Sequence, residues 1–211
     1  MTNTDPTTDL ADYETLDNLE TVQVNLKQAG SLAGVVAGLM TKSNCIGFVG
    51  GMRIPTTLTK YSAYRAAAQE VNSAGKGVDN FEAGFSDASA GVKLTESWIG
   101  TDNVDVMWCD ASAVDGGVRQ ALESAGADTH FNIAQPIDLC GSDHPCVVTS
   151  TVTDWKMGEA MSAIEDGSFG SGKVIEANIE NGGVSLGEYS EQIKADTFLT
   201  DDEVETIKSG L

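Results

Sequence analysis

Basic residues are scarce in this chain of 211 residues. Lys and Arg total 12 against 32 Asp and Glu, which gives a formal net charge of −20 at pH 7. A surface of this sign repels nucleic acid and anionic membranes, so we expect no nucleic-acid partner. The acidic residues are spread along the chain, a pattern that favours a halophilic, archaeal source, because high salt screens self-repulsion. An ordinary acidic protein is the alternative.

The motifs of the common nucleotide-binding and hydrolytic enzymes are also missing. No G-x-G-x-x-G follows the first apolar strand, and neither G-x-x-x-x-G-K-[ST] nor G-x-S-x-G occurs. Only two histidines are present, His130 and His144, so the usual residue for general acid–base catalysis is scarce. We therefore expect a binding protein without a cofactor rather than an enzyme. An enzyme that uses Asp110 or the loop between Cys140 and Cys146 is the alternative.

Long apolar runs are absent, and so is a recognisable export signal. No window of about 18 apolar residues exists, so the sequence predicts no membrane-spanning helix. The first 18 residues have neither a basic nor an apolar segment of the kind found in signal peptides. Taken as written, the chain is expected to be cytoplasmic.

Cysteine is limited to four residues. Cys45 and Cys109 lie in apolar strands and are expected to be buried. Cys140 and Cys146 bracket the loop CGSDHPC, where a disulfide is plausible in an exported protein and a pair of thiols in an intracellular one. His144 lies between them, but the spacing C-x₃-H-x-C matches none of the usual zinc sites. We expect no metal.

Strands and helices alternate along the rest of the chain. Predicted strands lie at 21–25, 45–49, 78–82, 104–109, 130–134, 146–152 and 173–179. Predicted helices lie at 27–40, 57–72, 87–100, 114–125 and from 154 to just before 167, followed after 183 by two short helices, the second beginning at Thr200. This alternation predicts an α/β fold with a mostly parallel sheet flanked by helices.

The carboxyl ends of the predicted strands are the expected binding region, because ligands bind there in parallel sheets. Gly50-Gly51 ends the strand CIGFVG, and a glycine pair lets the backbone turn tightly and present N–H groups to a ligand. A sharp turn without a ligand is the alternative. The other strand ends carry aromatic, hydroxyl and amide groups, which suit the binding of a small polar molecule.

Five segments resemble, in order and spacing, those of one family. They are AGSLAGVVAGLMTKSNCIGFVGGMRIP from residue 29, FEAGFSDASAG from 81, DNVDVMWCDAS from 102, CVVTSTVTDWKMG from 146 and ENGGVSLGEYSE from 180. By these motifs the chain is similar, from about residue 19 onward, to the basic membrane protein (BMP, PnrA-like) family. The resemblance implies a type I periplasmic-binding-protein fold that binds a nucleoside or similar small polar solute for an ABC transporter permease. It also implies a lipoprotein at the cell surface.

The resemblance further implies that the first of two lobes is largely missing. We expect a mobile acidic tail at 1–18, a first-lobe remnant and crossover at 19–44, a second lobe at 45–152, and a returning segment with closing helices at 153–211. The face left by the missing lobe predicts self-association. A cytoplasmic one-lobe sensor or interaction module, or a non-functional truncated remnant, is the alternative to a transport protein.

The resemblance places Phe85 where the family has an aromatic residue that stacks on the base, with a core position as the alternative. Gln135 stands where the family has an acidic residue. Thr153 stands where the family has a lysine, with Lys156 close by.

Residues 109–112 replace the family motif AAG-x-TG. In this segment Asp110 is expected either to bind ribose hydroxyls or to join the acidic surface. Arg53, one of three arginines, is expected to contact the ligand or a nearby acid. The predicted ligand-binding set is Gly51, Arg53, Phe85, Asp110, Ser112, Gln135 and Thr153.

Overall fold

The computed structural model describes residues 18–141, 143–170, 174–191 and 193. Its elements are β1 (Thr21–Val24), α1 (Leu26–Met40), β2 (Cys45–Gly50), α2 (Pro55–Val71), β3 (Lys76–Asn80), α3 (Ala88–Asp102), β4 (Val106–Asp110), α4 (Ala113–Gly126), β5 (Phe131–Ala134), β6 (Val147–Thr153), α5 (Met157–Asp166), β7 (Val174–Ala177) and β8 (Val184–Leu186). Every strand and helix predicted up to residue 179 is present, with ends shifted by a few residues. The short strand β8 was not predicted, and the helix expected to begin at Thr200 lies outside the described residues.

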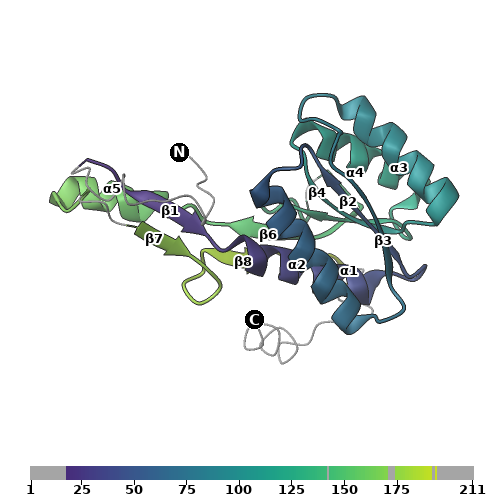
Figure 1. Ribbon diagram of the computed structural model, residues 1–211, viewed down its shortest axis with the longest axis horizontal. Coiled ribbons are helices and arrows are strands. Elements are labelled where there is room, and N and C mark those ends of the chain that lie inside the picture. The colour runs from purple at the N-terminus through teal and green to yellow at the C-terminus, as the bar shows by residue number, and fades with distance from the viewer. Residues whose placement is uncertain (1–17, 142, 171–173, 192, 194–211) are drawn as a thin grey trace.

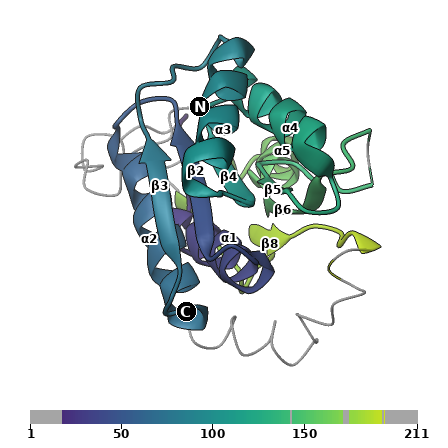
Figure 2. The ribbon, with the colours of Figure 1, turned by 90° about the vertical axis from the view of Figure 1, so that its right-hand side faces the viewer.

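Six strands form one sheet in the order β3-β2-β4-β5-β6-β8. All neighbouring strands run parallel except β8, which is antiparallel to β6. Helices α1 and α2 pack on one face, where the core includes Phe48, Tyr64 and Trp108. Helices α3 and α4 cover the other face over Val49, Met107 and neighbouring residues (Figure 2). The predicted α/β fold with a mostly parallel, helix-flanked sheet is therefore confirmed.

Helices α1 and α2 contact each other through glycines. Gly30, Gly34 and Gly38 recur every four residues and so share one face of α1. A Cβ atom built on Gly34 would lie 2.2 Å from the carbonyl oxygen of Tyr64, and one on Gly30 would lie 2.4 Å from that of Lys60. The two helix backbones can approach this closely only because these side chains are absent. The contact fixes where the first turns of α2 lie over the sheet.

Three elements lie apart from the large sheet, and we call them the arm: β1, α5 and β7. Strands β1 and β7 form a separate two-stranded parallel sheet. The arm extends away from α3 and α4 at one end of the molecule, with α5 beside the strands (Figure 1). Helix α1 lies on the large sheet, whereas β1, which directly precedes it, lies in the arm. The division into lobes stays a prediction. None of the described helices has the length and apolar character needed to cross a membrane.

Candidate functional site

The turn after β2 is tied to the neighbouring strand. The Gly51 N–H donates to the carbonyl oxygen of Asp110 (3.1 Å), which extends the β2–β4 pairing by one residue. The Gly51 carbonyl in turn accepts from the N–H of Gly84 (3.0 Å). The expectation that this turn offers the Gly51 N–H to a ligand is therefore wrong, because that group already has a partner.

Glycine at position 51 leaves room for a neighbouring side chain. A Cβ atom there would lie 2.3 Å from Cε1 of Phe85, so the aromatic ring lies directly against the turn. The carbonyl oxygen of Phe85 accepts from the N–H of Ala113 (3.0 Å), which ties this loop to the start of α4. Phe85 is 39% exposed and is not a core residue. Its ring is available for stacking beside the ends of β2 and β4.

Lys60 connects the ends of two strands. Its ammonium group donates to Oδ1 of Asp110 at the end of β4 (2.8 Å) and to Oε1 of Gln135 just after β5 (2.9 Å). The buried hydroxyl of Thr57 donates to Oδ2 of Asp110 (2.7 Å). The Gln135 side-chain amide donates to the carbonyl oxygen of Cys109. We call Lys60, Asp110 and Gln135 the strand-end cluster.

Sequence reasoning missed Lys60 and Thr57. Both lie in the first turns of α2 and, three residues apart, share a helix face with the buried Tyr64. The sequence did give one indication of their role: both are polar, yet they occupy the face of α2 that packs on the sheet. The direction of that face depends on how α2 packs against α1.

The strand-end cluster is close to electrically neutral. The side chains of Lys60 and Asp110 are only 15% and 23% exposed, so Asp110 does not belong to the acidic surface. Each carboxylate oxygen of Asp110 already accepts one hydrogen bond and keeps a lone pair for a second donor. The cluster can offer further hydrogen bonds to a polar solute without presenting a net charge of either sign.

The turn between β4 and α4 is held from beneath by a buried carboxyl group. Oδ1 of Asp115 accepts from the N–H of Ala111 (2.9 Å). Burial raises the pKa of Asp115 to about 7, against the opposing effects of the Ala111 hydrogen bond and the Arg119 guanidinium. Ser112, which is exposed, has φ 53° and ψ −112°. A non-glycine residue held in this region costs about 1–3 kcal/mol and is a feature of functional turns.

The remaining predicted residues lie near this cluster or at its margin. The backbone N–H of Thr153, at the end of β6, donates to the carbonyl oxygen of Pro136 (3.0 Å), directly after Gln135. The Arg53 guanidinium carbon lies 4.5 Å from the centre of the Phe81 ring, a cation–π contact. Hydrogen bonds and packing thus bring together Gly51, Phe85, Asp110 and Gln135, with Thr153 linked through the backbone. Their roles in binding are still predictions.

In the loop between Cys140 and Cys146, where a disulfide and a pair of thiols were the two alternatives, the structure has thiols. Cys140 Sγ lies 3.7 Å from the carbonyl oxygen of Val148, and Cys146 Sγ lies 3.6 Å from Oε1 of Glu123, so the two sulfur atoms have different partners. Burial and the nearby Glu123 raise the pKa of Cys146 to about 12, which makes its thiol unreactive. His144 Nδ1 lies 3.2 Å from Glu123. In the part of the chain that the structure describes, no three His, Cys, Asp or Glu residues are placed to hold a metal ion.

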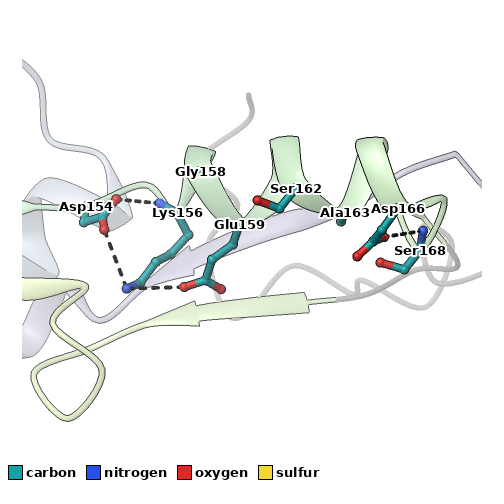
Figure 3. Close-up of a pocket in the computed structure, with 8 residues that line it drawn as sticks. All are labelled: Asp154, Lys156, Gly158, Glu159, Ser162, Ala163, Asp166 and Ser168. Atoms are coloured by element: carbon teal, nitrogen blue, oxygen red, sulfur yellow. Dashed lines mark hydrogen bonds and ion pairs between the residues drawn. The ribbon is translucent and has the colours of Figure 1, made fainter.

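A cavity of about 540 Å³ lies on the arm along α5 (Figure 3). Its lining residues are Asp154, Lys156, Gly158, Glu159, Ser162, Ala163, Asp166 and Ser168. The buried Lys156 ammonium donates to the carbonyl oxygen of Asn181 (2.9 Å) and lies 3.6 Å from both Asp154 and Glu159. The cavity therefore presents mainly carboxylates and hydroxyls and lacks an aromatic surface. The strand ends, with a neutral polar cluster beside Phe85, are the better candidate site.

Comparison with known proteins identifies what the chain is similar to. Residues 5–208 match the family described as "ABC transporter substrate-binding protein PnrA-like". The chain is 32% identical over 178 residues to the ABC transporter nucleoside-binding protein BmpA of Lactococcus lactis, covering 76% of this chain and 50% of that protein. It is 28% identical over 174 residues to basic membrane protein D of Borreliella burgdorferi, covering 80% of this chain and 50% of that protein. The chain thus spans about half the length of these relatives.

Solved structures show the same fold. A solute-binding protein of an ABC transporter system from Aeropyrum pernix superimposes with a TM-score of 0.73 at 21% identity, covering 92% of this chain and 59% of that one. A solute-binding protein from Conexibacter woesei gives a TM-score of 0.69 at 19% identity, covering 94% of this chain and 67% of that one. The predicted likeness to periplasmic-binding proteins is confirmed at the level of fold.

Proposed function

Because the chain belongs to the PnrA-like family of ABC transporter substrate-binding proteins, we propose that it binds a nucleoside or a similar small polar solute without changing it chemically. The observation that carries this proposal is the strand-end cluster beside the exposed ring of Phe85. The cluster supplies hydrogen bonds, and the ring supplies a flat apolar face. Binding of a nucleoside uses both the hydrogen bonds and the flat apolar face.

In this proposal each group has a part. The ring of Phe85 stacks on the base, an interaction worth about 1–3 kcal/mol. Asp110 accepts from hydroxyl groups through its remaining lone pairs, and Lys60 holds its carboxylate in place. Neutralisation of Asp110 by Lys60 favours an uncharged solute over a cation or an anion. The name of the Lactococcus relative supports a nucleoside as the solute.

The partners follow from the family. We place the chain with an ABC transporter permease, at the cell surface, as a lipoprotein component that delivers solute. In such a protein the described site forms one wall of the pocket, and closure of the other lobe over it encloses the solute. The net charge of −20 supports the proposal that this protein functions in high salt.

Ligand-observed NMR titration of the chain with adenosine, cytidine and free ribose in high salt tests the solute class. We expect both nucleosides to bind and ribose to bind more weakly, since ribose cannot stack on Phe85. Phe85→Ala should raise the Kd for adenosine about five- to 150-fold, the equivalent of one stacked base. Phe85→Leu keeps the apolar bulk without the flat ring and should bind adenosine nearly as weakly as Phe85→Ala.

A lysine variant tests the strand-end cluster separately. Lys60→Met should weaken adenosine binding, because Asp110 and Gln135 lose the group that positions them. Lys93→Met removes an exposed lysine from α3 and serves as the matched control. Equal affinities in the wild type, Phe85→Ala and Lys60→Met would contradict the proposed site.

A further inference from the structure

The turn between β4 and α4 is the point where the parts of the candidate site meet. The Asp110 carbonyl oxygen accepts from the N–H of Gly51, and the Asp110 carboxylate accepts from Lys60 on α2. The N–H of Ala113, at the start of α4, donates to the carbonyl oxygen of Phe85. The conformation of this turn therefore sets the positions of the aromatic ring and of the strand-end cluster together.

Asp115 holds this turn from inside the protein. It is the third residue of α4, and its carboxyl group reaches back to accept from the N–H of Ala111 (2.9 Å). Asp115 is only 9% exposed, whereas the neighbouring Ser112 is exposed. Because Ser112 has a positive φ of 53°, the turn keeps its conformation only with support from its surroundings. The carboxyl group of Asp115 supplies part of that support.

The surroundings of Asp115 favour its neutral, protonated form. The titratable and charged groups around it are Arg119 on its own helix, Asp110 and Cys109 on β4, Lys60 on α2, and the exposed Asp87 and Lys93 on α3, which packs on α4. No lysine or arginine in the described part of the chain forms an ion pair with Asp115. A buried carboxylate without such a partner is costly. Burial, with a smaller contribution from the charge of Asp110, raises the pKa of Asp115 to about 7.

We propose, on the basis of the proposed function, that the chain binds its nucleoside while Asp115 is a neutral acid and releases it as Asp115 ionises. Asp115 is then a positioning residue whose proton is taken up together with the solute. A solute seated on Asp110 and Phe85 covers the turn and keeps water away from it, whereas an ionised Asp115 needs that water. The solute and the proton therefore favour each other's binding, by the same factor in both directions.

This coupling makes the affinity for the solute fall as the pH rises. Below about pH 6 Asp115 is protonated with and without solute, so the affinity is constant. If the bound solute favours the neutral acid over the ion about tenfold, a usual size for such coupling, the Kd rises about eightfold from about pH 6 to about pH 9. The two histidines lie at the opposite edge of the sheet, His130 before β5 and His144 before β6, away from the proposed solute.

Isothermal titration of the full chain with adenosine at about pH 6, 7.5 and 9 in about 1 M KCl tests the proposal. Two buffers of different ionisation enthalpy at each pH give the number of protons taken up on binding. We expect the wild-type Kd to rise about eightfold over this range, with uptake of about half a proton near pH 7.5. Circular dichroism at each pH checks that every protein is folded.

Variants of Asp115 separate its proton from its hydrogen bond. Asp115→Asn cannot ionise and keeps an acceptor for the Ala111 N–H, so it should bind adenosine equally well at all three pH values and take up no proton. Asp115→Ala loses that acceptor and should bind more weakly than Asp115→Asn at every pH. Asp128→Asn, which removes an exposed carboxylate near the end of α4, is the matched control and should behave like the wild type.

The outcomes distinguish this proposal from the function on which it depends. Adenosine binding that is independent of pH and takes up no proton would overturn the proposal and leave the nucleoside site standing. The wild-type pH dependence in Asp115→Asn would also overturn it, because the proton would then belong to another group. Wild-type affinity in Asp115→Ala would remove the positioning role. No adenosine binding at any pH would overturn the proposed function, and the proposal with it.

Discussion

Asp115 should make the stability of this protein fall as the pH rises toward neutrality. Burial raises its pKa from an ordinary value of 3.8 to about 7. In the unfolded chain the carboxyl group ionises near pH 4, whereas in the folded protein it stays protonated up to about pH 7. The folded state therefore binds the extra proton between these values, and the free energy of unfolding decreases as the pH rises through this window.

The size of the effect follows from the shift. About three pKa units at about 1.4 kcal/mol each give roughly 4 kcal/mol, all of it lost above about pH 7 and none of it below about pH 4. Asp115→Asn cannot ionise, and its side-chain oxygen can still accept from the Ala111 N–H. The variant should therefore match the wild type near pH 4 and exceed its stability by a few kcal/mol at pH 8.

Urea unfolding of both proteins at a series of pH values in about 1 M KCl measures this difference. High salt suppresses the general repulsion among the other carboxylates, which is in any case common to the two proteins. Asp128→Asn removes an exposed carboxylate near the end of α4 and is the matched control. Parallel profiles of the free energy of unfolding against pH for the wild type and Asp115→Asn would show that Asp115 does not keep its proton up to about pH 7 in the folded protein.

Three glycine substitutions test the packing around the site. Gly51→Ala places a Cβ atom 2.3 Å from the Phe85 ring, which must swing outward, so adenosine affinity in the NMR titration should fall about as far as in Phe85→Ala. Gly34→Ala drives a methyl group against the backbone of α2, and denaturant unfolding should show a loss of about 1–3 kcal/mol. Gly100→Ala, in open space on α3, should instead add about 0.5–1 kcal/mol. Unchanged stability in Gly34→Ala would contradict the close helix contact.

Local patterns in the sequence predicted most of the fold. The start of α3 is an example: a helix was predicted from residue 87, and the Asp87 side chain caps it by accepting from the N–H of Ser89 (2.9 Å). Strand β8 escaped prediction because it has three residues and its partner, β6, lies some thirty residues earlier in the chain. A strand this short depends on that pairing and leaves no periodic pattern of its own.

The candidate site was predictable only in part. Parallel strands end at the same edge of a sheet, so the proximity of Asp110 and Gln135 follows from the alternation of strands and helices. Lys60 lies on a helix, and its direction is set by the glycine contact between α1 and α2, which the sequence does not reveal. The part played by Gly51 also depends on tertiary structure. The ring of Phe85 fits against the turn because residue 51 has no side chain, and Phe85 lies 34 residues further along the chain.

Binding of a nucleoside by the strand-end cluster and Phe85 together can be observed by two-dimensional ¹H–¹⁵N NMR of the labelled chain during addition of adenosine. We predict saturable shifts concentrated in the amide signals of Gly51, Phe85 and Asp110 and in the side-chain amide of Gln135. No saturable shift, or shifts concentrated in α5 around the cavity of the arm, would contradict it.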